Sequence, residues 1–240
     1  MQKSLQIIWE FQSGKGRAIR TLFYCPLCTN PEGSSHFYSD GHRDYYRCSH
    51  CHLIHVPVSQ HLSPEAERAE YDKHRNSPED AGYRKFLNRL FIPINDRLSP
   101  DSHGLDFGSG PGPTLSVIFE EAGCNMSLYD PFYAPDNNIL KGQYDFITAS
   151  EVVEHLHNPA AEFDLLWSIL KPGGWFGIMT KLALDKEAFS KWHYKSDPTH
   201  VCFFSKETMD WLAAKWNAEH VHIGRDVDLF KKSIVPDNRN

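Results

Sequence analysis

Four cysteines near the amino terminus have the spacing of a metal-binding site. Cys25-Pro26-Leu27-Cys28 and Cys48-Ser49-His50-Cys51 are two C-x₂-C pairs with 19 residues between them. Each pair can hold one side of a tetrahedral ion, and thiolates are preferred ligands of zinc. Two disulfides or inert thiols are the alternative, but a reducing cytoplasm disfavours disulfides. We therefore predict structural zinc at Cys25, Cys28, Cys48 and Cys51, with no coordination position left open for catalysis.

Other groups near these cysteines receive simpler interpretations. His50 and His52 are alternative ligands by position, but we expect them to be bystanders. Cys124 and Cys202 have no C-x₂-C partner, and we interpret both as small residues of the core.

A glycine-rich loop is the second feature whose residues point to chemistry. Gly108-Ser109-Gly110-Pro111-Gly112 follows a short apolar segment that reads as a strand and precedes a predicted helix. Glycines at such a turn allow the backbone to approach a ligand closely. Pro113 stands where a dinucleotide-binding motif has Gly or Ala, and no Gly-Lys-Ser/Thr sequence follows, so NAD and a P-loop are disfavoured. A tight turn without a ligand is the alternative.

An acidic residue accompanies this loop. Asp130 stands at the end of the next predicted strand, 24 residues after Asp106. A carboxylate at that place in a strand–helix–strand unit can accept hydrogen bonds from both hydroxyls of a ribose. The loop and Asp130 together favour a ligand that carries a nucleoside.

Candidates for acid–base chemistry gather in the 13 residues from Trp192 to Phe204, which combine aromatic side chains with Asp197 and His200. His200 is our preferred general base, with Asp197 beside it, because the proton affinity of an imidazole suits neutral pH. The alternative is a hydrogen-bonded brace of Asp197, Thr199 and His200 that supports a helix beginning near Ser205.

The elements that position these groups alternate from Gly104 onward. We expect strands at residues 104–107, 126–129, 145–149 and 175–179, helices at 114–122 and 160–170, and a closing pair of strands at 220–223 and 227–230. Two helices are expected earlier, one with its N-cap at Ser63 and one through 83–90. Strands that alternate with helices predict an α/β fold, in which helices cover both faces of a parallel sheet.

Three segments in this order resemble class I S-adenosylmethionine-dependent methyltransferases. Residues 104–112 are similar to the first motif of that family, 144–156 to its fourth-strand segment, and 170–174 to the turn before its fifth strand. The resemblance covers residues 103 to about 232. It implies a Rossmann-like sheet that is mostly parallel with one antiparallel strand. Only 14 residues separate Asp130 from Asp145, so the region of the third strand must be shortened.

The resemblance also implies S-adenosylmethionine as the cofactor. Gly108, Gly110 and Gly112 would face its methionine part, and Asp130 would hold the ribose. Ser150 and Glu151 would line the cleft in which the methyl group is delivered, and His155 would line the cofactor or support the structure. The predicted cofactor-binding residues are Asp106, Gly108, Ser109, Gly110, Gly112, Asp130, Pro131, Ser150, Glu151 and His155. Phe132 and Tyr133 are candidates to replace the missing adenine contacts.

These observations divide the chain into an arm at 1–20, a zinc-ribbon-like module at 21–60, a helical linker or lid at 61–99 and a methyltransferase domain at 100–240. No apolar segment reaches the roughly 20 residues of a membrane span, and no secretory signal precedes the first module, so we predict a cytoplasmic protein without membrane contact. The sequence indicates no oligomeric state.

The expected function is methyl transfer to an acceptor that the sequence does not name. Residues 101–240 carry 12 Lys and Arg against 20 Asp and Glu, and such an acidic balance repels a phosphate backbone. A small molecule, either a sugar or a metabolite, is therefore slightly favoured. An RNA base, with the zinc module docking RNA, is one alternative. A non-catalytic binding protein on a methyltransferase scaffold is the other.

Overall fold

The computed structural model describes residues 24–73 and 76–234, so the predicted arm at 1–20 lies outside the described residues. The strands are β1 (Ser34–Ser39), β2 (Asp44–Cys48), β3 (Ile54–His55), β4 (His103–Phe107), β5 (Asn125–Tyr129), β6 (Tyr144–Ser150), β7 (Leu170–Met179), β8 (Cys202–Phe203), β9 (Glu219–Ile223) and β10 (Val227–Lys231). The α-helices are α1 (Pro64–Tyr71), α2 (Ala81–Asn95), α3 (Thr114–Glu121), α4 (Pro159–Ile169), α5 (Lys186–Ser190) and α6 (Lys206–Trp216).

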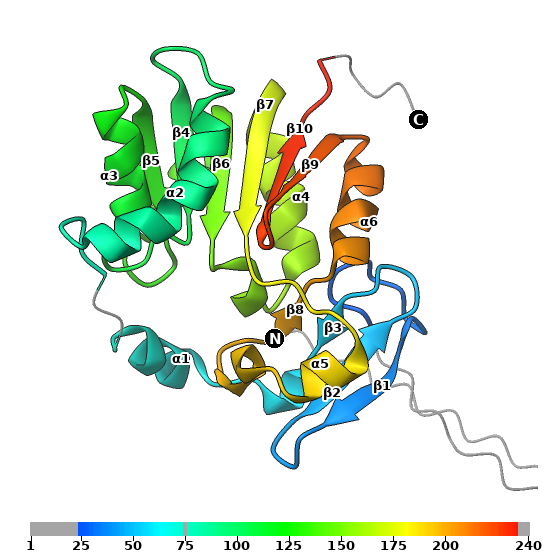
Figure 1. The fold of residues 1–240 in the computed structure, drawn as a ribbon. Coiled ribbons are helices and arrows are strands. Elements are labelled where there is room, and N and C mark those ends of the chain that lie inside the picture. Colours follow the sequence, from blue (N-terminus) through cyan, green and yellow to red (C-terminus); the bar gives the residue numbers. More distant parts are fainter. Residues whose placement is uncertain (1–23, 74–75, 235–240) are drawn as a thin grey trace, which may run out of the picture.

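A six-stranded sheet forms the centre of the molecule, in the order β5-β4-β6-β7-β10-β9. The strands β5, β4, β6 and β7 are parallel, and β10 is antiparallel to both of its neighbours. Among the described residues, the chain between β5 and β6 adds no strand to this sheet. It forms an isolated bridge between Asp130 and Ala134 and a 3₁₀ turn, Ile139–Lys141. The predicted Rossmann-like sheet with one antiparallel strand and a shortened third-strand region is therefore confirmed (Figure 1).

The segment expected to be a turn before β7 is instead part of that strand. We predicted a helix to residue 170 and a strand from 175, but α4 ends at Ile169 and β7 begins at Leu170. Leu170 pairs with Tyr144 of β6, and Gly173 and Gly174 exchange backbone hydrogen bonds with Lys232. These contacts with distant parts of the chain override the local turn signal of the proline and glycines.

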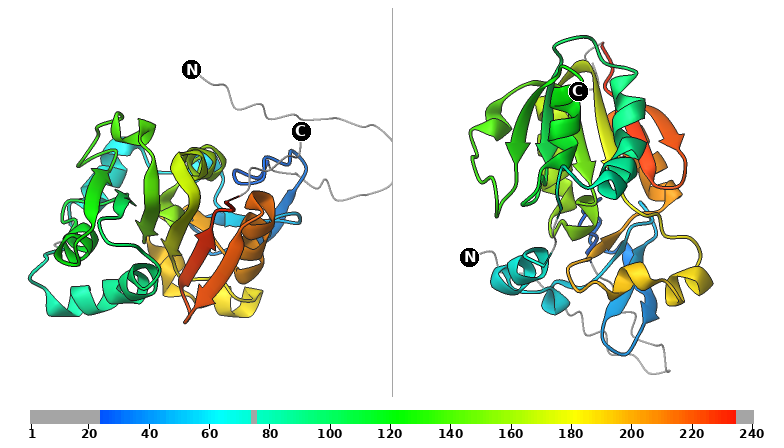
Figure 2. Two further views of the ribbon diagram at one scale, coloured as in Figure 1. Left: turned by 90° about the horizontal axis from the view of Figure 1, so that it is seen from above. Right: turned by 60° about the vertical axis from the view of Figure 1, so that its left-hand side comes forward.

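Helices cover both faces of the large sheet, as Figure 2 shows. On one face, Leu87, Leu90 and Ile94 of α2 form a buried cluster with residues of α3 and of the strands. The predicted helix at 83–90 lies inside α2, and the Ser63 hydroxyl accepts a hydrogen bond from the Ala66 N–H as the N-cap of α1. On the other face, α4 and α6 pack against a second and larger cluster.

A small four-stranded sheet joins the amino-terminal module to the rest of the chain. Its order is β1-β2-β3-β8, so its last strand comes from the region after β7. Ile54 pairs with Phe203 and His55 with Cys202. Leu53 and Ile54 share a hydrophobic cluster with Phe163 of α4 and Phe203. Within the described residues, the cysteine module and the part of the chain that forms the large sheet therefore share one core. No helix of these residues is long and apolar enough to cross a membrane.

Candidate functional site

The glycine loop lies at the carboxyl end of β4 with its middle glycine open. Gly108 and Gly110 have φ angles of +76° and +63°, a region that favours glycine. A Cβ added at Gly110 would meet no atom within 4 Å, whereas one at Gly108 would meet Val152 at 2.4 Å. A Cβ at Gly112 would meet the Asn76 carbonyl oxygen at 2.4 Å. The loop is therefore closed at both flanks and open at Gly110, where a ligand can approach the backbone.

Asp130 lies against this loop, as predicted from the sequence. Its Oδ2 accepts a hydrogen bond from the Gly110 N–H at 3.0 Å, and its Oδ1 accepts from the N–H groups of Phe132 and Tyr133 at 2.8 and 3.0 Å. A carboxylate oxygen has two lone pairs, so Oδ2 retains acceptor capacity for a ribose hydroxyl. Pro131, the next residue, is exposed beside it.

Asp106 lies beneath the loop and not in the open part of the cleft. It is 3% exposed, and its carboxylate accepts hydrogen bonds from the hydroxyls of Ser116 at 2.9 Å and Thr148 at 3.0 Å. Burial raises the pKa of Asp106 to about 6. Asp106 thus ties β4 to α3 and β6, and we interpret it as a residue that positions the loop. Ser109 continues the loop, with its N–H directed to the Tyr129 carbonyl oxygen.

Glu151 follows Ser150, the last residue of β6, and has a strained backbone. Its φ is +53°, and its N–H donates to the Met179 carbonyl oxygen at 2.7 Å. A non-glycine residue in this region costs about 1–3 kcal/mol, and such residues cluster at functional sites. Since Val152 packs under Gly108, Glu151 stands next to the glycine loop. Its Oε1 is buried without a hydrogen-bond partner among the described residues.

Tyr194 connects Glu151 to a second buried acid, Glu154. The Tyr194 hydroxyl donates to Glu154 Oε1 and lies 3.4 Å from Glu151 Oε2. Burial raises the pKa of Glu154 to about 7, and burial followed by the charge of Glu154 raises that of Glu151 to about 8. Lys181 partly offsets the effect on Glu151, and its ammonium lies 4.8 Å from the centroid of the Tyr194 ring. The sequence analysis assigned no role to Glu154, Tyr194 or Lys181.

His200 and Asp197 lie next to this group, together with His155. His200 is 6% exposed, and its ring centroid is 4.6 Å from that of His155. Burial and then His155 lower the pKa of His200 to about 4, so the ring is neutral at physiological pH. Asp197 Oδ1 accepts hydrogen bonds from the N–H and hydroxyl of Thr199 at 2.9 and 2.6 Å. The Asp197–Thr199 part of the expected brace is present, and the role of His200 as a base stays a prediction.

Arg43, a residue of the cysteine module, holds the segment that carries Asp197 and His200. Its guanidinium donates to the carbonyl oxygens of His200 at 2.9 Å, Asp197 at 3.0 Å and Pro198 at 3.3 Å, and also to that of Lys195. A planar guanidinium has five N–H donors in a fixed geometry, which suits several converging carbonyl groups. The sequence analysis missed Arg43, because no local pattern links it to residues more than 150 positions away.

The four predicted cysteines are brought together by two similar turns. Cys25 Sγ lies 3.4 Å from Cys51 Sγ, Cys28 Sγ lies 3.5 Å from Cys48 Sγ, and all four sulfur atoms are within 4.8 Å of one another. Zinc–sulfur bonds of about 2.3 Å imply sulfur–sulfur separations of about 3.8 Å in a tetrahedron, so the cluster fits zinc.

The backbone repeats around the two cysteine pairs. Thr29 donates to the Cys25 carbonyl oxygen and His52 to that of Cys48, both at 3.1 Å, and both residues have positive φ angles of 58° and 62°. This geometry gives His52 a role in the backbone of the turn. The ring centroids of His50 and Trp211 are 5.9 Å apart, and this packing fits the interpretation of His50 as a bystander.

Aromatic side chains pack together beside Asp130. The ring centroid of Tyr71, in α1, lies 5.8 Å from that of Phe132 and 5.3 Å from that of His155. The Tyr133 hydroxyl donates to Asp72 at 2.6 Å. Helix α1 therefore lies over the segment that follows Asp130, where Phe132 and Tyr133 were suggested as adenine contacts.

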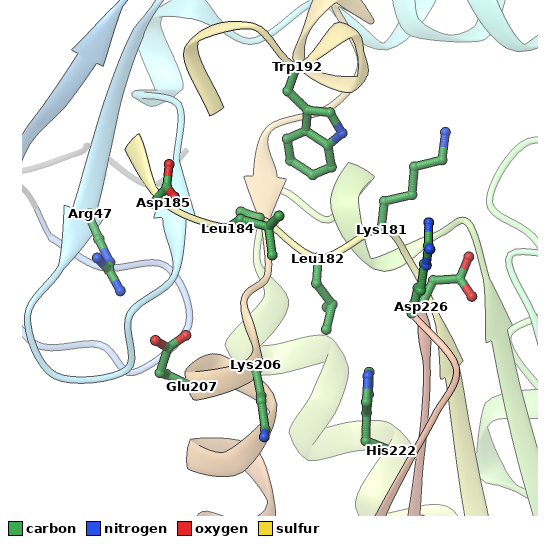
Figure 3. A pocket seen from close by; sticks show the side chains of 12 residues that line it. Arg47, Lys181, Leu182, Leu184, Asp185, Trp192, Lys206, Glu207, His222 and Asp226 are labelled. Carbon is green, nitrogen blue, oxygen red and sulfur yellow. The ribbon is translucent and has the colours of Figure 1, made fainter. Parts of the chain in front are cut away.

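A hollow of about 980 Å³ is lined by Lys181 and Trp192 (Figure 3), two residues that also contact the Tyr194 ring. It lies between the loop after β7, the turn from β9 to β10, β2 and the start of α6. Lys181 and Asp226, two of its lining residues, act electrostatically on Glu151. Its lining combines charged and apolar residues, namely Arg47, Lys181, Leu182, Ala183, Leu184, Asp185, Trp192, Lys206, Glu207, His222, Arg225 and Asp226.

A Rossmann-like sheet with an open glycine loop and an acid at the end of the next strand defines a nucleoside-cofactor site of the class I methyltransferase type. Residues 71–223 match the family described as a methyltransferase domain, which is more than half of the chain. The chain belongs to this family.

One similar protein is matched over part of its length. A stretch of 84 residues is 27% identical to a ubiquinone biosynthesis O-methyltransferase of Shewanella pealeana, and it covers 35% of this chain and 36% of that protein. The match thus spans about a third of the relative's length.

Solved structures of methyltransferases are also similar. One from Archaeoglobus fulgidus has 18% identity and a TM-score of 0.47, with 69% of this chain and 99% of that chain covered. Magnesium protoporphyrin IX methyltransferase from Synechocystis PCC 6803, with bound SAH, has 12% identity and a TM-score of 0.47, with coverage of 63% and 84%.

Proposed function

We propose that the protein methylates a small molecule and that Glu151 is the general base for the acceptor. The observation that carries this proposal is the carboxylate of Glu151, which stands beside the glycine loop with one buried oxygen lacking a partner among the described residues. A buried polar atom without a partner is costly, and in a cleft it suggests that a ligand supplies the missing hydrogen bond. The strained backbone of Glu151 agrees with a functional position.

The chemistry asks little of the protein beyond alignment and proton removal. S-adenosylmethionine would supply a methyl group bonded to a sulfonium sulfur, and the neutral thioether S-adenosylhomocysteine would be the leaving group. Gly110 and Asp130 would hold the cofactor at the carboxyl ends of β4 and β5. In its ionised form, which becomes the major form above its pKa of about 8, Glu151 would accept a proton from the acceptor, and general-base catalysis of this kind contributes roughly 10²–10⁴ in rate. The Tyr194 hydroxyl would orient the two acids by its contacts with both.

The size of the adjacent hollow supports a small acceptor. Its volume of about 980 Å³ is at the upper end of the range of about 300–1,000 Å³ that is usual for small-molecule sites. Trp192 and Leu182 provide apolar surface, and Lys181 and Arg225 provide donors that could bind hydroxyl or carboxylate groups. The acidic balance of residues 101–240 opposes an extended contact with RNA.

We further propose that the four cysteines bind structural zinc and that this module shapes the acceptor site. The module contributes Arg43 to the segment of His200, and the Pro26 carbonyl oxygen accepts from the N–H of Ala160 at the start of α4 at 3.2 Å. These contacts give the module a structural task within the catalytic part. They favour this task over the separate docking of RNA.

Incubation with methyl-labelled S-adenosylmethionine and separated cell fractions tests the class of acceptor. We expect label in the small-molecule fraction and background in RNA and protein. Label that enters RNA, and is released from it by nuclease, would overturn the proposed acceptor class. The Glu120→Gln variant changes an exposed acid on α3 and should label as the wild type does. It controls for the loss of a carboxylate far from the cleft.

A further inference from the structure

A second cluster of metal-ligating side chains combines residues of the turn after β6 with one residue of the segment that Arg43 holds. Glu154, His155 and His200 each offer one ligand atom, and these atoms lie within 4.8 Å of one another. Glu154 and His155 belong to the 3₁₀ turn Val153–His155 that follows β6, and His200 precedes β8. The cluster is separate in sequence from the four cysteines, and it differs from them in chemistry because its donors are nitrogen and oxygen.

Both histidines are held in the tautomer that leaves Nε2 as the nitrogen able to bind a metal. The Nδ1 of His200 lies 2.7 Å from the Tyr194 carbonyl oxygen, and the Nδ1 of His155 lies 3.3 Å from that of Thr199. A carbonyl oxygen only accepts, so each Nδ1 carries the proton and each Nε2 is the acceptor nitrogen of a neutral ring. Metal-binding histidines almost always donate their other N–H to a carbonyl or carboxylate group in this way.

Glu154 supplies an independent indication of a cation. It is completely buried, and its Oε1 accepts from Tyr194, while its Oε2 is buried without a hydrogen-bond partner among the described residues. A buried carboxylate oxygen without compensation is unfavourable, and buried charges are ordinarily paired or coordinate metals. Asp197 brings another carboxylate to the edge of the cluster, since its Oδ2 lies 3.8 Å from His200 Nε2.

We infer that Glu154, His155 and His200 bind a divalent transition-metal cation, with the Asp197 carboxylate at the edge of the site. Two imidazoles and a carboxylate suit Zn²⁺, Fe²⁺, Mn²⁺ or Co²⁺, whereas Mg²⁺ and Ca²⁺ prefer all-oxygen sites. A site of this kind has positions open for exogenous ligands. Because Tyr194 links Glu154 to Glu151, an acceptor oxygen bound there would lie beside the general base proposed above. The cation site itself does not depend on that proposed function.

Titration of the full-length, zinc-loaded chain with Co²⁺, after dialysis against a weak chelator, tests the site. We expect one Co²⁺ per chain with the d–d absorption of nitrogen and oxygen ligation and without thiolate charge-transfer bands. Glu154→Gln and His200→Ala should each weaken this binding by more than about 100-fold, since loss of a ligand should exceed the 10–100-fold effect of an outer partner. The content of cysteine-bound zinc should not change in either variant, which shows that the variant is folded.

His193→Ala provides the matched control, because His193 is exposed in the same segment as His200. This variant should bind Co²⁺ as the wild type does. Three results would overturn the inference: no added ion, a spectrum with thiolate charge transfer, or unchanged binding in Glu154→Gln and His200→Ala. None of these results bears on the methyltransferase activity, which the labelling experiment measures separately.

Discussion

The guanidinium of Arg43 donates a hydrogen bond to the carbonyl oxygen of His200 at 2.9 Å, across 157 positions of sequence. This contact joins the cysteine module to the segment between α5 and β8 that lines the site. The same guanidinium reaches three further carbonyl oxygens of that segment. The module therefore takes part in forming the site, and several consequences can be measured.

Arg43→Ala should lower kcat with little effect on the binding of S-adenosylhomocysteine. Hydrogen bonds from a charged donor contribute about 1.5–3 kcal/mol each, and their loss should release the segment of Asp197 and His200. We expect kcat to fall at least tenfold, while the Kd for S-adenosylhomocysteine changes less than twofold. Arg84→Ala removes a partly exposed ion pair with Glu121 and should be nearly neutral. Equal activity of the two variants would contradict the positioning role of Arg43.

Gly110→Val should weaken the binding of S-adenosylhomocysteine by more than tenfold, equivalent to about 1.4 kcal/mol. The side chain would occupy the open space above the loop, and its backbone has a φ of +63°. Gly123→Val is the matched control, because Gly123 also has a positive φ and open space but lies after α3. The two variants should lose similar stability. If calorimetry gives both the wild-type affinity, the cofactor does not bind at this loop.

Asp130→Asn should reduce the affinity for S-adenosylhomocysteine by about tenfold or more, because charge-assisted hydrogen bonds contribute roughly 1.5–3 kcal/mol. Asparagine can retain the contacts of Oδ1 with the N–H groups of Phe132 and Tyr133, so the turn should persist. Asp136→Asn, in an exposed position of the same loop, is the comparison. Wild-type affinity in Asp130→Asn would show that this carboxylate does not hold the ribose.

Asp106 should make the stability of the protein fall as pH rises. Its pKa is about 6 in the folded protein against an ordinary value of 3.8, so the unfolded chain loses the proton first. The stabilisation is complete below the ordinary pKa and is lost as pH rises through the folded pKa. Asp106→Asn lacks this titration. In urea denaturation, the free energy of unfolding of the variant, compared with that of wild type, should rise by about 2 kcal/mol between pH 4 and pH 7. A difference that does not vary with pH would refute the raised pKa.

If the four cysteines bind zinc as proposed, its removal should loosen residues well outside the cysteine module. Strand β3 pairs with β8, and Arg43 holds residues 195–200. We expect Cys28→Ser to lower the zinc content by one ion per chain and to speed hydrogen exchange at Val201 and Cys202. Cys124→Ser, which changes a cysteine outside the cluster, should alter neither property. Unchanged exchange at β8 in the zinc-depleted protein would argue against the coupling.

Features that depend on local sequence could be predicted. The alternation of strands and helices along the chain follows from periodicity, and the glycine loop from the backbone freedom of glycine. The Rossmann-like sheet is implied by the resemblance to class I methyltransferases, and the structure places Gly110 and Asp130 in direct contact. The cysteine spacing likewise predicts a cluster, because each C-x₂-C pair forms its own turn.

Features that depend on distant contacts could not be predicted. The pairing of β3 with β8, the role of Arg43 and the extension of β7 to Leu170 all arise from residues far apart in sequence. Glu154 carried one unused signal, since two acids three residues apart directly follow the predicted strand at 145–149 and Ser150. Its burial against Tyr194 appears only in three dimensions.

The rate of methyl transfer by Glu151→Gln tests the central claim most directly. The variant keeps the size of the side chain and removes its ability to accept a proton, so we expect the single-turnover rate to fall by about 10²–10⁴. Affinity for S-adenosylhomocysteine should stay within a few-fold of wild type, and Glu120→Gln should transfer methyl groups at the wild-type rate. A wild-type rate in Glu151→Gln would contradict the assignment of Glu151 as the base.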